Sequence, residues 1–347
     1  MDWTRSMRQV PRYFRVNPAS WLDAEPLDTV TSCKTTRERD SEVRESASLS
    51  FDGMLDEEFW VRCYVDCTQD GTTERVPIGT WLVQTPRRTI GTVSDVSAVA
   101  YSSLHPLREN HLPVLWHAPA GSNCAELARQ VCETYGVAPV LASRSNARLA
   151  QNFVAGHKQS ALEVARALAS AADMDVSVDA LGRVTISPVQ QSFAMLPQWT
   201  FRDDGQSILE NGAEEEFDWF DVPNVCEVVS GDLVGRAELP SEEPMSEARR
   251  GRRVVLRVEN PDELKSGATQ ELADLVAEMR LREACATERT IRATHGLCPL
   301  RAGECAEVDW SAHGLSMRGI VERQEIDVET GMRIASTIKS ESGRWDR

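Results

Sequence analysis

Alternation of apolar and polar residues with a period of two runs through the first hundred residues. Residues 47–51 and 59–65 alternate in this way, and Asp70-Gly71 then supplies a hairpin turn. Return strands are predicted over 76–85 and 92–101. The pattern predicts a meander of four or more antiparallel strands, which is typical of a β-barrel or a sandwich.

Near residue 117 the hydrophobic period changes from 2 to 3.6. Two pairs have the spacing of a capping box, Asn123 with Glu126 and Ser160 with Glu163, and an amphipathic stripe follows each of them. Alternation returns in DVSVDALGRVTISP, which predicts a β-hairpin around Leu181-Gly182. We therefore expect residues 117–188 to form a small α+β module inserted into a β-rich protein.

The remainder of the chain predicts strands around one long helix. VPNVCEVVSGD and VVLRVEN are expected strands, and ELPSEEPMSEARRGRR between them is expected to be an exposed, mobile loop. Residues 268–289 are predicted to be the longest helix, with an apolar stripe of Leu272, Leu275, Val276 and Met279. The end is β again, in ECAEVDW, LSMRGIVERQEIDV and MRIASTIKS.

The net charge of the chain argues against some classes of function. The 347 residues include 54 acids and 38 bases, a formal charge of −16, and residues 203–247 hold fourteen acids against one base. Such an excess argues against a general nucleic-acid binder or a protein that adheres to anionic lipid. No run of 18 apolar residues exists, so no membrane segment is predicted, and the N-terminus lacks the apolar region of a secretory signal. The nine cysteines are expected to be reduced and to pack as small buried hydrophobes.

The sequence holds no recognisable catalytic or nucleotide-binding motif. Cys285, His295, Cys298, Cys305 and His313 lack the close ligand pairs of structural zinc sites. The carboxylate runs lack EF-hand spacing and are interpreted as solvated faces. The tryptophans, including Trp60, Trp81, Trp199, Trp219 and Trp310, are more simply explained by core packing than by carbohydrate binding. We therefore predict no enzyme, no cofactor and no metal.

Three histidines recur at six-residue spacing in YSSLHPLRENHLPVLWH. These are His105, His111 and His117, and the prolines of this stretch, Pro106 among them, disfavour a helix. We expect an exposed connecting loop here, because no close carboxylate or cysteine partner is evident.

The order of several segments is more informative than any single motif. An amphipathic helix, a short strand and D-x-x-G-R-V lead into a strand ending in Pro, in ALEVARALASAADMDVSVDALGRVTISP. WTFRDDGQSIL, an acidic connector and FDVPNVCEVVSGD follow, and then come TQELADLVAEMRLREAC, HGLCPLRAGECAEVDW and EIDVETGMRIASTIK. This order resembles the hub proteins at the distal end of tailed-phage tails, a family that includes baseplate hubs and the hub part of type VI secretion spikes. The resemblance covers most of residues 28–340.

The resemblance implies a fold and an assembly. Such hubs are trimeric rings in which each subunit gives two tube-type β-barrel domains, so that the ring presents pseudo-sixfold symmetry to hexameric neighbours. Residues 1–116, completed by about 189–235, would form the first barrel, 117–188 the α+β module, and 236–347 the second barrel.

The resemblance also implies a function and partners. The chain would be a structural, non-enzymatic part of the virion tail tip, assembled in the host cytoplasm, that joins the tail tube to tip or spike proteins and lets DNA pass. Its implied partners are two further copies of itself, neighbouring tail-tube or distal tail rings, the tape-measure protein, and tip, spike or fibre proteins.

Two charged segments are the candidate sites. An acidic lining would repel DNA, whereas lysines and arginines would hold its phosphates. The candidate lumen or interface acids are Asp203, Asp204, Glu214, Glu215, Glu216, Asp218 and Asp221. The candidate docking arm, which would bind an acidic neighbouring ring, carries Arg5, Arg8, Arg12 and Arg15. The alternative for the arm is a frayed terminus.

Two other functions stay open at this stage. One is a tail-associated cell-wall hydrolase, which usually needs further C-terminal length. The other is a glycan- or receptor-binding module, which would be monomeric and would bind sugars through exposed tryptophans.

Overall fold

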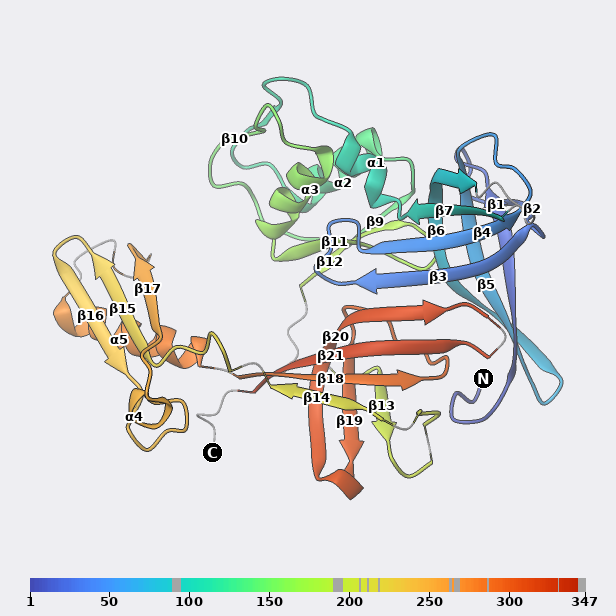
Figure 1. The fold of residues 1–347 in the computed structure, drawn as a ribbon. Coiled ribbons are helices and arrows are strands. Elements are labelled where there is room, and N and C mark those ends of the chain that lie inside the picture. The colour runs from blue at the N-terminus through green and yellow to red at the C-terminus, as the bar shows by residue number, and fades with distance from the viewer. Residues whose placement is uncertain are drawn as a thin grey trace. The chain divides into compact units, whose positions relative to one another are not determined.

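The computed structural model describes residues 1–88, 95–189, 196–205, 207–210, 212–217, 219–261, 264, 269–285, 287–329 and 331–342. The chain divides into two compact units (Figure 1). Unit 1 comprises Met1–Gly212 and Ala293–Thr337, and unit 2 comprises Ala213–Arg292 and Ile338–Arg347. The predicted division into two barrels and a module stays a prediction. Among the described residues no helix has the length and apolar character needed to cross a membrane.

Strands dominate the fold, which confirms the predicted mainly β class. In chain order the strands are β1 (Arg8–Val16), β2 (Asp23–Pro26), β3 (Val30–Glu38), β4 (Glu45–Asp52), β5 (Phe59–Gln69), β6 (Thr72–Arg88), β7 (Asp95–Tyr101), β8 (His117–Ala118), β9 (Val140–Ala142), β10 (Phe153–Val154), β11 (Met174–Val178), β12 (Val184–Pro188), β13 (Trp199–Arg202), β14 (Glu214–Phe217), β15 (Val225–Ser230), β16 (Leu233–Glu238), β17 (Val255–Glu259), β18 (Thr287–His295), β19 (Cys305–Trp310), β20 (Leu315–Asp327) and β21 (Arg333–Ser342). The helices are α1 (Leu104–Glu109), α2 (Cys124–Tyr135), α3 (Ala161–Ser170), α4 (Glu247–Arg250) and α5 (Gln270–Ala284).

One sheet connects the N-terminal and C-terminal β sections. Its order is β14-β18-β21-β20-β3-β4-β7-β6-β5-β1-β2, and β19 pairs with both β13 and β20. The predicted antiparallel strands of the first hundred residues are confirmed, although β4 pairs with β7 instead of β5. The long β20 pairs with β19 through Leu315–Ile320 and with β3 through Arg323–Asp327. Residues almost 290 positions apart, such as Glu38 and Arg323, therefore lie opposite each other.

The helices of the predicted α+β module form where capping residues were expected. The Asn123 side chain accepts from the backbone N–H of Glu126, and Ser160 and Glu163 make both bonds of a capping box. The sheet β11-β12-β9 packs beside these helices. Its strands β11 and β12 form the predicted hairpin, which is thereby confirmed. The module shares its hydrophobic core with residues of the large sheet such as Trp60.

Three local expectations were wrong. The histidine stretch contains α1, because Pro106 lies in the first turn, where its missing N–H is not needed. Residues 238–253 include α4, which Ser246 caps and which ends at Gly251 with φ of 65°. The long helix, α5, ends at Ala284, and the chain continues from residue 287 as β18.

The face that α5 buries also differs from the predicted stripe. Its buried residues are Ala273, Val276, Ala277 and Leu281, whereas Leu275 is 60% exposed. The small alanines let the helix approach β16 closely, so this face is chosen by the fit to the sheet and not by side-chain size. Together with β15, β16 and β17, α5 forms the core of unit 2.

Candidate functional site

The first two candidate acids lie on an exposed loop of unit 1. Asp203 and Asp204 follow β13, and both are exposed. The Asp203 carboxylate accepts a hydrogen bond of 2.9 Å from the backbone N–H of Ala312, and Asp204 lies 4.0 Å from Arg202. Their charges are therefore held at the surface by local contacts.

The next three candidate acids form a strand of unit 2. Glu214, Glu215 and Glu216 lie on β14, which pairs antiparallel with β18. Arg289 Nε lies 2.6 Å from Glu215 Oε1, and Arg292 lies 4.0 Å from Glu214 and 3.5 Å from Glu216. Three acids face two arginines, so these five side chains carry a formal charge of −1 and not −3. The acidic appearance of this stretch in the sequence is thus largely compensated by β18.

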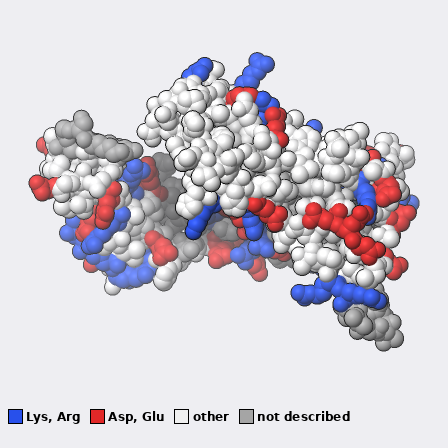
Figure 2. Space-filling view, turned by 90° about the horizontal axis from the view of Figure 1, so that it is seen from above, with Lys and Arg blue, Asp and Glu red and all other residues white. Residues whose placement is uncertain are grey.

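The last two candidate acids are Asp221 and Asp218. Asp221 is exposed on the loop before β15. Asp218 lies outside the described residues. Asp203 and Asp204 belong to unit 1, and Glu214 to Asp221 belong to unit 2, so the candidate acids are divided between two units. Figure 2 shows acidic and basic side chains close together on the visible face of each unit.

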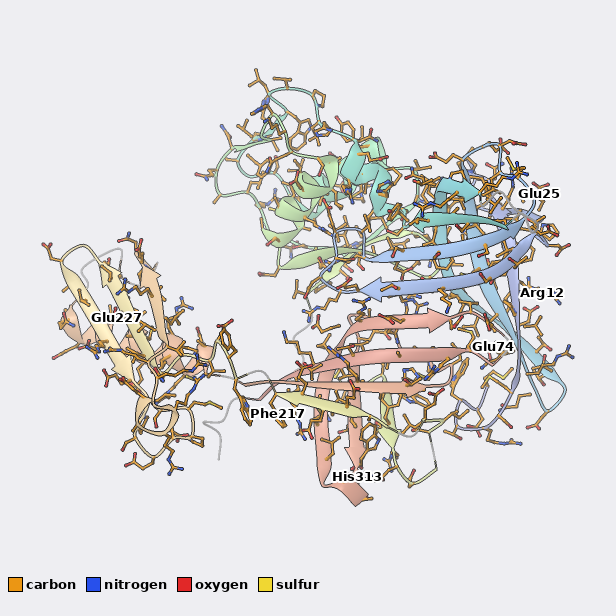
Figure 3. The ribbon with its side chains drawn as sticks, in the orientation of Figure 1. Arg12, Glu25, Glu74, Phe217, Glu227 and His313 are labelled. Atoms are coloured by element: carbon orange, nitrogen blue, oxygen red, sulfur yellow. The ribbon has the colours of Figure 1, made fainter. Side chains whose placement is uncertain are left out.

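The candidate docking arm is a strand of the sheet. Residues 8–16 form β1, which pairs with β5 from Arg8↔Thr68 to Val16↔Trp60, so this segment is not a frayed end. Figure 3 labels Arg12 on β1, with Glu25 on β2 and Glu74 on β6.

Three of the four arm arginines pair with acids of the same unit. Arg5 lies 2.9 Å from Asp70, and Arg12 lies 3.4 Å from Asp66. Arg15 lies 2.5 Å from Glu57 and 3.4 Å from Glu25. Arg8 is exposed. Because these acids already offset most of the positive charge, docking through this segment stays a prediction.

The residues considered for metal binding do not assemble into a site. No cluster of three or more His, Cys, Asp or Glu side chains with metal-site geometry occurs among the described residues. His105 is buried, against expectation, and stacks on Tyr101 at a ring separation of 4.6 Å, while His111 and His117 are exposed. All nine cysteines are buried, which confirms their predicted packing role.

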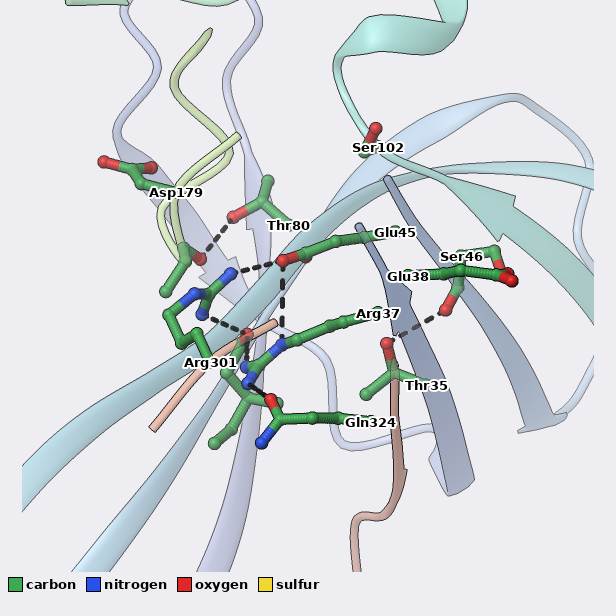
Figure 4. Close-up of polar contacts among 12 residues, drawn as sticks. Thr35, Arg37, Glu38, Glu45, Ser46, Thr80, Ser102, Asp179, Arg301 and Gln324 are labelled. Atoms are coloured by element: carbon green, nitrogen blue, oxygen red, sulfur yellow. Dashed lines mark hydrogen bonds and ion pairs between the residues drawn. The ribbon is translucent and has the colours of Figure 1, made fainter. Parts of the chain in front are cut away.

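A buried polar network that the sequence did not reveal lies in unit 1 (Figure 4). Glu45 pairs with Arg301 and lies 3.6 Å from Arg37 Nε. Arg37 also donates 2.6 Å to the carbonyl of Ile78 and 3.1 Å to Gln324. Burial and the nearby Arg301 lower the pKa of Arg37 to about 9. These residues come from β3, the start of β4, β6, the loop before β19, and β20.

The network continues to a buried histidine. Gln324 donates 3.2 Å to Ser336 Oγ, and Ser336 Oγ lies 2.8 Å from His295 Nε2. His295 Nδ1 lies 2.7 Å from the Gly296 carbonyl, which can only accept, so Nδ1 carries the proton and Nε2 accepts from Ser336. The chain of bonds thereby links β3, β20, β21 and β18.

Protonation of His295 is expected to destabilise unit 1 in mild acid. Burial lowers the pKa of His295 to about 4, below its ordinary value of 6.5. The unfolded chain therefore binds the proton first, and stability falls as the pH falls from about 6.5 to about 4. Between pH 7 and pH 5 the loss attributable to this residue is roughly 2 kcal/mol.

Urea unfolding at both pH values measures this loss. His295→Gln removes the titrating group, so the difference in its unfolding free energy between pH 7 and pH 5 is expected to be smaller than that of the wild type by this amount. His111→Gln, at an exposed histidine, is the control and is expected to keep the wild-type difference. An unchanged difference in His295→Gln would contradict the prediction.

Comparison with known proteins shows the fold. No family model and no curated protein sequence matches the chain. A tail protein from Neisseria meningitidis is similar in structure, with a TM-score of 0.62 and 11% identity, over 95% of this chain and 97% of that one. The 43 kDa tail protein of prophage MuSo2 from Shewanella oneidensis has a TM-score of 0.64 and 11% identity, over 95% and 98%.

A chain of a two-protein complex is similar as well. A chain of the Francisella PdpA–VgrG complex has a TM-score of 0.58 and 8% identity, and the similarity covers 97% of this chain and 58% of that chain. Both tail proteins match over nearly their whole length, so the similarity is not confined to one segment of either chain. The chain therefore has the fold of these two tail proteins and of a chain of the PdpA–VgrG complex.

Proposed function

We propose that this chain is the structural hub of a phage-like tail, in which three copies form a ring around an axial passage for DNA. The observation that carries the proposal is the similarity in fold to two tail proteins over 95% of the chain. A hub of this kind acts by joining neighbouring proteins, and it needs no catalytic group. The proposed location is the tail tip of the virion.

The charge of the chain supports the proposed passage. A formal charge of −16 repels the phosphates of DNA, so DNA can move past without being held. The compensation of Glu214, Glu215 and Glu216 by two arginines means that repulsion would depend on the protein's overall charge more than on this strand.

The proposed partners follow from the same fold. They are the tail-tube or distal tail rings, the tape-measure protein, and the tip, spike or fibre proteins. One neighbour of similar fold is a chain of a complex of PdpA with VgrG, which supports a role in binding other proteins.

Light scattering and electron microscopy of the purified full chain test the proposal. The expected result is a mass three times the 38.6 kDa of one chain and a ring with an axial opening. A gel-shift assay with linear duplex DNA at low salt is expected to show no retention. A monomer without a ring, or tight DNA binding, would overturn the proposal.

The two other functions have tests of their own. Clearing of a suspension of host cell walls would identify a hydrolase, and binding of the monomer to a glycan array would identify a carbohydrate-binding module. The proposed hub is expected to do neither.

A further inference from the structure

Unit 2 displays three large aromatic side chains on its surface. Phe217, Trp219 and Phe220 are 41%, 49% and 70% exposed. The rings of Phe217 and Trp219 are 6.0 Å apart, and Figure 3 labels Phe217 at the end of β14. Large aromatics usually bury most of their surface, and a group of exposed ones marks an interaction site more often than an accident of folding.

Two arginines hold this segment in place through its backbone. Arg250 donates to the carbonyls of Val222 at 2.6 Å and Trp219 at 2.7 Å, and Arg252 donates to the carbonyl of Phe220 at 2.7 Å. The left-handed Gly251 between the two arginines ends α4. These bonds fix the backbone that carries the aromatic side chains before any partner arrives, which lowers the entropy cost of binding.

The aromatic patch consists of Phe217, Trp219, Phe220, Arg250 and Arg252. Together with Pro244 and Met245 it lines a depression of about 640 Å³. The guanidinium of Arg252 lies 5.2 Å from the centre of the Phe220 ring. Aromatic residues and arginine are the types that most often dominate the binding energy of protein interfaces.

The charge around the aromatic patch indicates which partner it fits. Arg249, Arg250, Arg252 and Arg253 give four positive charges within five residues of a chain whose formal charge is −16. Arg253 is engaged by Glu227 and Glu238, and Arg249 is exposed and helps to lower the pKa of Glu242. The depression itself is lined by Arg250 and Arg252, with no acid among its described lining residues. Two copies of so acidic a chain repel each other unless a locally basic surface of one meets the acidic surface of the other.

We propose that the aromatic patch is the contact through which one copy of the chain binds the acidic surface of the next copy. In a closed ring each interface joins two different surfaces, so one such basic, apolar patch per copy is sufficient. This inference rests on the proposed homotrimer and names the surface that holds it together.

Light scattering over a dilution series tests the inference in the full chain. The double variant Trp219→Ser/Phe220→Ser is expected to raise the dissociation constant of the trimer about 30-fold or more. Arg249→Glu, which leaves the aromatics and their backbone contacts in place, is expected to raise it as well, and the rise is expected to shrink at high salt. The matched control is Val114→Ser/Leu115→Ser, which removes two exposed apolar side chains of unit 1 and is expected to leave the dissociation constant unchanged.

The outcomes separate the inference from the proposed function. A monomeric wild type contradicts the homotrimer itself. A trimeric wild type whose affinity is unchanged both by the aromatic double variant and by Arg249→Glu overturns the inference and leaves the hub intact. Thermal unfolding of each variant verifies its fold, and Arg249→Glu decides the matter if the double variant is unfolded.

Discussion

Glu45→Gln is expected to lower the unfolding free energy of unit 1 by about 3–5 kcal/mol. The Glu45 carboxylate pairs with Arg301 and lies 3.6 Å from Arg37, and the side chains of Glu45 and Arg37 are only 5% and 6% exposed. The substitution keeps the shape of the side chain but removes the negative charge. Arg37 and Arg301 then lie close together, and Glu304 is left to offset the charge of both. The melting temperature, followed by circular dichroism, is expected to fall by about 10 °C.

Two further variants show whether the lost charge is the cause. Glu325→Gln makes the same change at an exposed ion pair of the same sheet, with Arg323 at 2.7 Å, and is expected to cost less than about 1 kcal/mol. Arg37→Met removes one of the buried positive charges. In the double variant Arg37→Met/Glu45→Gln the total loss is expected to be smaller than the sum of the two single losses. Additive losses would show that the two residues act independently.

Features that depend on neighbouring residues were readable from the sequence. Ser160 and Glu163 formed the predicted capping box, because both bonds join residues three positions apart. The alternation at 47–51 and 59–65 became β4 and β5, because one side of each strand must be buried. The burial of Trp60 did not follow from this alternation, because Trp60 lies on the opposite side of β5 from Phe59 and Val61 and packs in the core of the α+β module.

Features that depend on residues far apart in the sequence could not be read from the sequence. The pairing of β20 with β3, and the burial of Glu45 with Arg301, join positions more than 250 residues apart. No local period encodes such contacts, and charged residues in a sequence are ordinarily assigned to the surface. The error at α5 has the same origin, since the face it buries is decided by what β16 presents to it. Trp219 shows the reverse case, a residue assigned to the core that the fold leaves at the surface.

The candidate sites show how folding can offset an excess of acidic or basic residues in one stretch of the sequence. Residues 203–247 contain fourteen acids and one base, yet Arg289 and Arg292, which lie far outside that stretch, pair with three of the acids. On β1 the relation is reversed, and acids from other parts of unit 1 pair with Arg12 and Arg15. A surface such as the depression lined by Arg250 and Arg252, with no acid among its described lining residues, is therefore a better guide to a partner than a run in the sequence.

Gly235 determines how closely α5 approaches the sheet of unit 2. A Cβ atom at this position would lie 2.1 Å from the carbonyl oxygen of Ala273 and 2.8 Å from the backbone nitrogen of Asp274. Both are backbone atoms of α5, so no side-chain rotation can make room. Glycine on β16 and alanine on the helix thus form a matched contact, while the larger Leu275 and Met279 are exposed.

Gly235→Ala is consequently expected to force α5 away from β16 and to destabilise unit 2 by about 3 kcal/mol. Hydrogen exchange followed by mass spectrometry is the measurement, because it separates the two units. Amides of β15, β16 and α5 are expected to lose protection, while those of β3 and β20 in unit 1 keep theirs. Gly156→Ala is the control, since its added Cβ would meet only the flexible Gln159 side chain, at 3.3 Å. Unchanged protection of β16 in Gly235→Ala would show that the close approach of helix and strand is not what holds unit 2 together.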